Sequence, residues 1–202
     1  MPRIASLPVD QWDPGLRALL QVDTAPLPDV HKTILGVYAN APELAKPFFT
    51  FEAAFWAGFT LRRRLLEMMR LRIAFHNQCR SCMAMRCEPA LEDGLTEDLV
   101  CSLERPVEAP DLTEAEKAAL QFADAFATNH LAIDDETIEG LRRFYSEKEI
   151  VELCMVCAYC TGFGRFAAIY KAIEDLPESY QDMTARTTPW ASDHTERVVV
   201  PF

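Results

Sequence analysis

The sequence is short of glycine, of basic residues and of β-strand patterns. Only seven of its 202 residues are glycine, and no alternating run of β-branched residues lies between turn signals before the last residues, which argues against a sheet-based fold. The 20 basic residues are outnumbered by 31 acidic ones, which gives a net charge of −11. A field of that sign repels phosphate backbones and anionic lipid head groups, so we expect neither nucleic acid nor a membrane as a partner.

The sequence also lacks targeting signals and an even set of cysteines. Its N-terminus has no apolar segment of the secretory type, and no apolar run approaches the roughly 20 residues that span a bilayer, so we expect a cytoplasmic protein. The seven cysteines form an odd number, unlike the framework of a small secreted disulfide scaffold. Most should therefore be free thiols. In a reducing compartment a close cysteine pair indicates catalysis or metal binding before a structural disulfide.

Apolar residues recur at helical spacing along most of the chain, which predicts an all-α fold with a single core. We expect an N-terminal arm over residues 1–27, a helical domain over 28–175, and an irregular tail over 176–202 that packs on a neighbour or is mobile. Helices are predicted at 28–39, 42–57, 60–77, 79–91, 96–103, 113–129, 134–145 and 147–175.

Cys79 and Cys82 are the candidate functional centre, which we interpret as a redox-active dithiol. Asn77 and Gln78 interrupt the apolar pattern between two predicted helices, so Cys79 falls near a helix N-terminus, where unpaired N–H groups favour a thiolate. The i, i+3 spacing puts both sulfur atoms on one helical face, within reach of a reversible disulfide.

Glu67 lies twelve residues before Cys79, on the helix that leads into the turn. If the two helices pack as a hairpin, its carboxylate points at the dithiol and accepts or relays a proton. Alternatively, Glu67 pairs with an arginine at helical spacing, such as Arg63, Arg64 or Arg70. Spacing alone favours the ion pair, because most charged helix residues are solvated.

The segment from Glu67 to Cys82, together with 146–153 and 164–167, resembles the carboxymuconolactone decarboxylase family, in particular its alkylhydroperoxidase-D-like (AhpD-like) branch. The specific part is the Glu-x11-Cys-x2-Cys element. The resemblance implies an AhpD-like helical bundle that assembles into trimers or hexamers, with a dimer as a further alternative. It also implies a peroxiredoxin-like alkylhydroperoxidase without a cofactor, in which Cys79 and Cys82 cycle between dithiol and disulfide, an unknown thiol or protein supplies the electrons, and Glu67 belongs to a proton relay.

The sequence departs from this family at one position of the relay. The usual histidine four residues after the second cysteine is Arg86 here, which predicts weak or absent peroxidase activity. His76, three residues before Cys79, is the candidate substitute; alternatively, it is hydrogen-bonded at a helix end. Because arginine does not transfer protons at neutral pH, we assign Arg86 to holding the thiolate or a carboxylate substrate. Which cysteine attacks the substrate stays open.

Two other functional classes compete with a thiol peroxidase. A lyase acting on a lactone or keto acid, as in the decarboxylase branch of the family, would hold the substrate carboxylate with arginines, although the dithiol argues against it. A non-enzymatic zinc or scaffold oligomer is the second alternative, since His76, Cys79, Cys82 and Cys87 are zinc-type ligands. These ligands would diverge in direction along a continuing helix, so we assign no metal ligand.

Three further groups of residues are interpreted first as structural. Cys154, Cys157 and Cys160 lie in an apolar stretch and indicate core packing rather than iron–sulfur ligands. The basic cluster over 62–72 is expected to be solvated or ion-paired, or alternatively to form an anion-binding wall beside the dithiol. The aromatic run over 48–56 is expected in the core, or alternatively around an apolar pocket.

Overall fold

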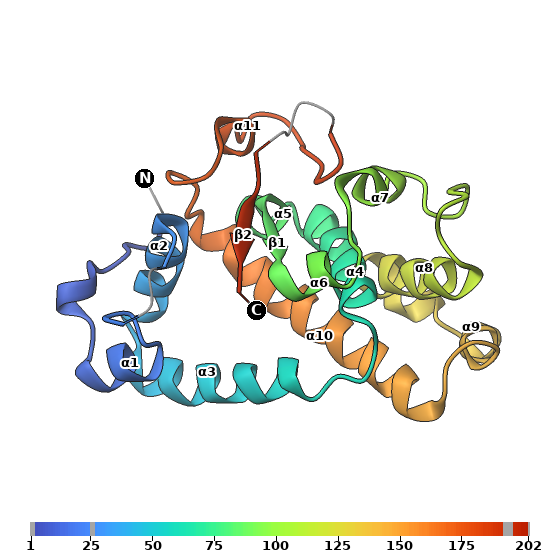
Figure 1. Ribbon diagram of the computed structural model, residues 1–202, viewed down its shortest axis with the longest axis horizontal. Helices are drawn as coiled ribbons and strands as arrows, with labels where there is room; N and C mark the ends of the chain where they lie inside the picture. Colours follow the sequence, from blue (N-terminus) through green and yellow to red (C-terminus); the bar gives the residue numbers. More distant parts are fainter. Residues whose placement is uncertain (1–2, 25–26, 192–195, 202) are drawn as a thin grey trace.

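The computed structural model describes residues 3–24, 27–191 and 196–201, and their regular structure is almost entirely helical, as predicted (Figure 1). The longer helices are α2 (Asp29–Tyr38), α3 (Pro42–Ala57), α4 (Arg63–Asn77), α8 (Glu114–Asn129) and α10 (Glu147–Tyr170). The shorter ones are α1 (Pro14–Leu19), α5 (Arg80–Ala84), α6 (Glu88–Glu92), α7 (Glu97–Ser102), α9 (Asp135–Arg142) and α11 (Glu178–Gln181). Short 3-10 turns lie at Val9–Gln11 and His130–Ala132. Two short strands, β1 (Met85–Cys87) and β2 (Val198–Val200), pair in parallel.

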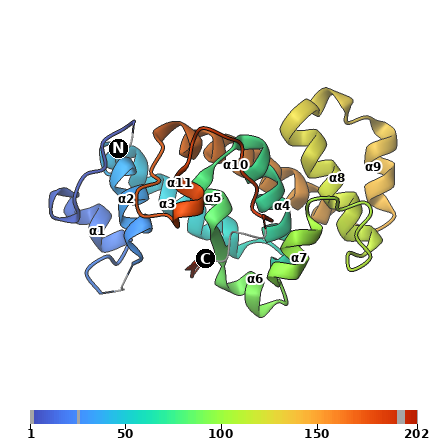
Figure 2. The same ribbon diagram turned by 90° about the horizontal axis from the view of Figure 1, so that it is seen from above.

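The core forms where α4, α8 and α10 pack together. Seen from above, α1 to α3 lie at one end of the molecule, α8 and α9 lie at the other, and α4 and α10 occupy the middle (Figure 2). Met68, Met69 and Leu71 of α4 have no exposed surface and belong to the main apolar cluster. Capping boxes at Thr113 and Ser146 start α8 and α10, two of these three helices.

Helix α10 corrects one sequence-based expectation. By length and composition it is apolar enough to cross a membrane, so the statement that no apolar run approaches that length is wrong. Leu153, Val156 and Cys157 of this helix are buried in the main cluster, however, and a core helix of a soluble protein meets the same criterion. The packing of α10 on α4 accounts for these buried residues, whereas other apolar residues of the helix, among them Val151 and Met155, are exposed.

The helix predicted over 79–91 is wrong. α5 ends at Ala84, and residues 85–87 are extended because they pair with β2 near the other end of the chain, with Met85 opposite Val198. A new helix, α6, then begins at Glu88, with Pro89 in its first turn. The predicted helix over 147–175 also ends early, at Tyr170, because Lys171 adopts a left-handed φ of 57° and acts as the C-cap.

The described part of the C-terminal tail packs on its own chain, and a contact with a neighbour stays a prediction. The side chain of Gln78 donates to the carbonyl of Thr187 and accepts its N–H, at 3.2 and 3.1 Å. Arg80 donates to the carbonyl of Ala185. Trp190 is only 8% exposed and packs on Phe75. The tail therefore covers the segment that contains the cysteine pair.

Candidate functional site

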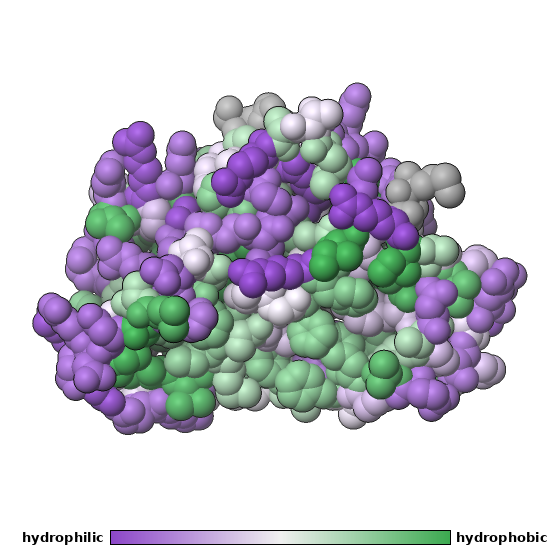
Figure 3. Space-filling view, turned by 180° about the vertical axis from the view of Figure 1, so that it is seen from behind, coloured by the Kyte–Doolittle hydropathy of each residue, from purple (hydrophilic) through white to green (hydrophobic). Residues whose placement is uncertain are grey.

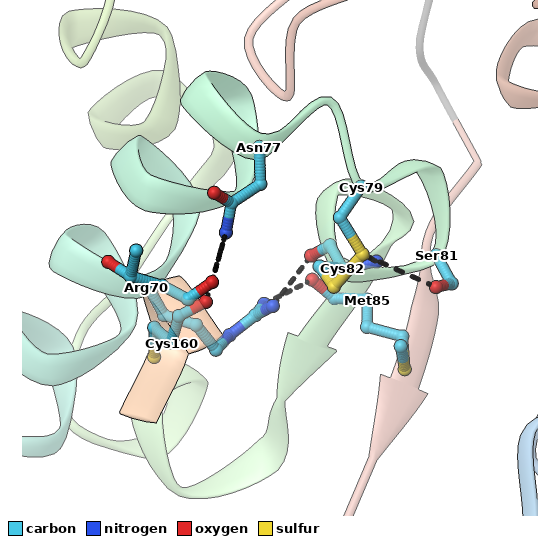
Figure 4. Close-up of a disulfide and its surroundings, with 8 residues drawn as sticks. Arg70, Asn77, Cys79, Ser81, Cys82, Met85 and Cys160 are labelled. Carbon is cyan, nitrogen blue, oxygen red and sulfur yellow. Dashed lines mark hydrogen bonds between the residues drawn. A yellow bond between two sulfur atoms is a disulfide. The ribbon is translucent and has the colours of Figure 1, made fainter. Parts of the chain in front are cut away.

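The cysteine pair lies where α4 turns into α5. Gln78 has a left-handed φ of 52°, which ends α4 and lets Cys79 lead the next helix as its N-cap. Cys79 and Cys82 are joined by a disulfide, with their Cα atoms 5.2 Å apart (Figure 4). The sulfur of Cys79 also accepts the backbone N–H of Cys82 at 3.3 Å. The structure thus has the predicted pair at a helix start, within bonding distance.

The two sulfur atoms differ in access. Cys79 is fully buried, and its Sγ lies 3.6 Å from the hydroxyl of Ser81. Cys82 is partly exposed and lines a cavity of about 140 Å³. Cys82 is therefore the sulfur that a small molecule in this cavity would meet.

The cavity lies between α2, α3, α4 and α10, with the α5–β1 segment also contributing to its wall. Its lining is mainly apolar and aromatic: Ile34, Tyr38, Glu52, Trp56, Arg70, Ala74, Ser81, Cys82, Met85, Tyr159, Cys160, Phe163, Gly164, Ala167 and Tyr170. An apolar cavity of about 150 Å³ accommodates a molecule the size of benzene. The pocket-lining interpretation of the aromatic run is thus confirmed for Trp56, and the space suits a compact apolar ligand.

Glu67 is buried in an ion pair rather than exposed. It is 3% exposed, and its two carboxylate oxygens accept from Arg70 Nε and Nη2 at 2.6 and 2.7 Å. Burial raises the pKa of Glu67, but the charge and hydrogen bonds of Arg70 outweigh it, so the pKa lies below its ordinary value. Glu67 is therefore ionised at neutral pH, and the predicted pairing with an arginine at helical spacing is confirmed.

Arg70 connects this carboxylate to the dithiol segment. Its guanidinium donates to the backbone carbonyls of Cys82 and Met85 at 2.6 and 2.9 Å, and it lines the cavity beside Cys82 (Figure 4). Glu67 thus acts on the α5–β1 segment through Arg70 and also directly, because its Oε1 accepts the backbone N–H of Cys87 at 3.2 Å. Its role in a proton relay stays a prediction.

His76 lies on the other side of α4. His76 follows Glu67 by nine residues. At about 3.6 residues per turn this is a half-integral number of turns, so the two side chains point to opposite sides of α4. His76 Nε2 lies 2.8 Å from Asp124 of α8, whose carboxylate also accepts from Arg72. The alternative interpretation, a hydrogen-bonded histidine near a helix end, describes this position, and the arrangement does not join His76 to Glu67.

Arg86 has a structural role, because its hydrogen bonds join separate segments of the chain. It is 1% exposed, and all five N–H donors of its guanidinium are occupied. Two pair with Glu97, at 2.9 and 3.2 Å, and three reach the carbonyls of Met83, Met85 and Pro189. No donor is left for a thiolate or a substrate carboxylate. This arrangement gives no support to the predicted substrate-binding role or to a lyase that depends on it.

The remaining arginines and cysteines also have structural partners. Arg62 pairs with Asp93 and Arg64 with Glu116, so the ion-paired interpretation of the basic cluster is confirmed for these residues, and the pairs give no support to an anion-binding wall. Cys157 and Cys160 are buried in the core, as predicted. Over the described ranges, no three His, Cys, Asp or Glu side chains are grouped so that they could hold a metal ion.

Sequence reasoning missed two polar residues of the cavity, Glu52 and Tyr159. The Tyr159 hydroxyl donates to Glu52 Oε1 across the space between α10 and α3. Burial raises the pKa of Glu52, and the hydrogen bond from Tyr159 opposes this effect. One signal was available, because Glu52 is the single charged residue between Pro47 and Phe59.

Comparison with known proteins supports the resemblance. The model of the carboxymuconolactone decarboxylase family matches residues 42–125, which include Glu67 and both cysteines. A protein of unknown function from Agrobacterium tumefaciens, named as a candidate antioxidant defence protein AhpD, is 27% identical over 66% of this chain and 92% of its own, with a TM-score of 0.56. A variant of the debrominase Bmp8 in complex with 2,3,4-tribromopyrrole is 21% identical over 86% of this chain and 92% of its own, with a TM-score of 0.65, which shows a shared fold.

A curated relative is similar in one segment only. An uncharacterised protein of Mycobacterium tuberculosis is 40% identical over 89 residues, which are 43% of this chain. The match spans 31% of that relative's length, so this chain corresponds to less than a third of it.

Proposed function

We propose that this chain, whose residues 42–125 belong to the carboxymuconolactone decarboxylase family, reduces organic hydroperoxides through a dithiol–disulfide cycle of Cys79 and Cys82. One observation carries the proposal: a cysteine within bonding distance of a second cysteine lines an apolar cavity. The Cys79–Cys82 pair can supply two electrons, which is what reduction of a peroxide to an alcohol and water requires.

We assign the attack to Cys82 and the resolving step to Cys79. Cys82 meets the cavity, whereas Cys79 has no exposed surface. The Cys82 thiolate bonds to the terminal oxygen of the hydroperoxide, the O–O bond breaks, and a sulfenic acid forms on Cys82. Cys79 then attacks this sulfur, the disulfide closes and water leaves.

The test is consumption of cumene hydroperoxide by the purified protein with a dithiol reductant, followed by mass spectrometry of the protein without reductant. We expect turnover above the uncatalysed rate, and one disulfide between residues 79 and 82 for each hydroperoxide consumed. A wild-type rate equal to the uncatalysed rate would falsify the proposal. Oxidation located on Cys87, Cys154 or another thiol instead would also contradict it.

Reductive debromination of a small aromatic ring is a second candidate function. The observation that favours it is the benzene-sized, aromatic-lined cavity at Cys82, together with the fold shared with a debrominase bound to tribromopyrrole. In such a reaction a C–Br bond becomes a C–H bond, bromide leaves, and the two thiols become a disulfide. Bromide release from 2,3,4-tribromopyrrole in the presence of a dithiol, measured beside hydroperoxide consumption, separates the two candidates.

The free thiols and the disulfide cycle indicate which compartment and which kind of electron donor the protein uses. Five cysteines outside the pair are free thiols, which fits the reducing conditions of the cytoplasm. We therefore propose a cytoplasmic protein that a thiol or a protein dithiol reduces after each turnover.

We also propose that the chain self-associates through an apolar face on α3 and α10. Figure 3 shows apolar residues gathered across the lower half of the molecule seen from behind. The exposed large apolar residues of α3 and α10 include Leu44 (74% exposed), Phe51 (50%), Val151 (57%), Met155 (45%) and Ile169 (57%). Large exposed apolar patches commonly mark protein interfaces.

Changing two of these residues to glutamate is expected to dissociate the oligomer, because an interface cannot bury unpaired charges. Sedimentation velocity of wild type should give a trimer, a hexamer or a dimer, and the Val151→Glu/Met155→Glu variant should sediment as a monomer. Val107→Glu, at an exposed residue outside α3 and α10 (55% exposed), serves as the matched control and should leave the mass unchanged. A monomeric wild type would rule out self-association.

A further inference from the structure

The cavity that Cys82 lines contains a second reactive group, the carboxyl of Glu52. Tyr159 donates its hydroxyl hydrogen bond to Glu52 Oε1. The other oxygen, Oε2, receives no hydrogen bond from any described residue, and Glu52 itself lines the cavity. A protonated Oε2 could therefore donate to a molecule bound in the cavity.

The surroundings of Glu52 favour its protonated form. In the part of the chain that the structure describes, no Arg, Lys or His side chain forms an ion pair with Glu52, and burial raises its pKa. The polar and titratable groups that line the cavity with it are Tyr38 of α2, Arg70 of α4, Ser81 and Cys82 of α5, and Tyr159, Cys160 and Tyr170 of α10. Arg70, the one cation in this set, is neutralised by Glu67.

Cleavage of a hydroperoxide needs a proton in this cavity. The attack of the thiolate leaves an alkoxide, which is a strong base and a poor leaving group unless an acid protonates it as the O–O bond breaks. The groups assigned from the sequence do not meet this need in the structure. Glu67 is ionised by Arg70, His76 points toward Asp124, and Arg86 does not release a proton at neutral pH.

We propose that Glu52, held by Tyr159, donates the proton that the leaving alcohol oxygen takes up when Cys82 cleaves an organic hydroperoxide; this inference rests on the proposed function. The O–O bond breaks as the S–O bond forms, the proton passes from Glu52 to the alkoxide, and an alcohol leaves. Glu52 regains a proton when Cys82 next ionises. Over one cycle two thiols and ROOH become one disulfide, ROH and water.

The size of the cavity adds a substrate class. Its volume of about 140 Å³ is close to that of an apolar cavity known to bind benzene, about 150 Å³. A hydroperoxide with one compact hydrocarbon group, such as cumene or tert-butyl hydroperoxide, suits this space, and its oxygen atoms would find polar partners in Glu52 and Cys82.

The experiment compares two leaving groups. Cumene hydroperoxide releases an alkoxide and needs the acid, whereas peroxyacetic acid releases a weakly basic carboxylate and does not. Rates of both are measured for wild type, Glu52→Gln, Tyr159→Phe and Glu43→Gln. Glu43 lies on the same helix, and its side chain is 85% exposed, so it is the matched control. Thermal unfolding of each variant checks the fold.

We expect Glu52→Gln to lower kcat/KM for cumene hydroperoxide by about 100- to 10,000-fold and to leave that for peroxyacetic acid nearly unchanged. Tyr159→Phe should show the same selectivity with a smaller loss, and Glu43→Gln should match wild type. With cumene hydroperoxide the wild-type rate should fall as the pH rises through the pKa of Glu52, because the acid form acts. Glu52→Gln should lack this decline.

Two results would overturn the inference while the proposed function stands. One is a Glu52→Gln variant as fast as wild type on cumene hydroperoxide, and the other is an equal loss on both substrates, which would indicate a structural role. A wild type that consumes neither substrate would overturn the proposed function itself, and the inference with it.

Discussion

Replacing Cys82 with serine is expected to abolish hydroperoxide consumption, whereas replacing Cys79 with serine is expected to leave one oxidation per chain. Cys82 lines the cavity, and Cys79 is fully buried. Without Cys82 no thiolate meets the substrate. Without Cys79 the first step still occurs, but the sulfenic acid on Cys82 has no resolving thiol and turnover stops.

A stoichiometric measurement separates the two variants. Each reduced protein receives one equivalent of cumene hydroperoxide and a sulfenic-acid probe, and the labelled residue is located by mass spectrometry. The label is expected on Cys82 in Cys79→Ser and to be missing in Cys82→Ser. Cys101→Ser, at an exposed free thiol, is the control and should behave as wild type. Labelling of Cys79 in the Cys82→Ser protein would reverse the assignment.

Replacing Glu67 with glutamine is expected to lower the free energy of unfolding by about 3–5 kcal/mol, because it leaves a charged Arg70 without its partner in a buried position. The side chains of Glu67 and Arg70 are 2% and 14% exposed. Arg70 also donates to the carbonyls of Cys82 and Met85, so it cannot easily turn toward water. Urea unfolding of both proteins at one protein concentration measures the difference.

The contribution of the Glu67–Arg70 ion pair to the free energy of unfolding depends on pH. The pKa of Glu67 is lowered in the folded protein, so its ion pair stabilises the fold above the unfolded-state pKa, and this stabilisation is lost as the pH falls through the folded-state pKa. The difference between wild type and Glu67→Gln should therefore be full at pH 7 and shrink in acid. Glu114→Gln removes a solvent-exposed ion pair with Lys117 and should cost less than about 1 kcal/mol. A Glu67→Gln protein as stable as this control would disprove a net contribution from the pair.

Local signals predicted much of the helical fold. The prediction for residues 42–57 matches α3 at both ends, and the hydroxyl and glutamate of each capping box start α8 and α10 where expected. These features depend on residues a few positions apart. β1 depends instead on β2, which lies near the far end of the chain, so the helical spacing of residues 79–91 concealed it.

The candidate site was predictable to the same extent. The Cys79–Cys82 pair and its place at a helix start follow from spacing and from the break at Asn77 and Gln78. The partners of Arg86 could not be predicted, because Glu97 and Pro189 come from separate segments. Glu52 and Tyr159 meet across two helices, so neither residue indicates the contact by itself.

The burial of Cys79 also sets the order of events in a catalytic cycle. Because Cys82 lines the cavity and Cys79 is buried, the oxidant and the reductant must both enter this cavity, one after the other. The alcohol has to leave before a reducing thiol can enter and form its mixed disulfide with Cys82. Such a protein follows ping-pong kinetics, and a high concentration of either substrate slows the half-reaction of the other.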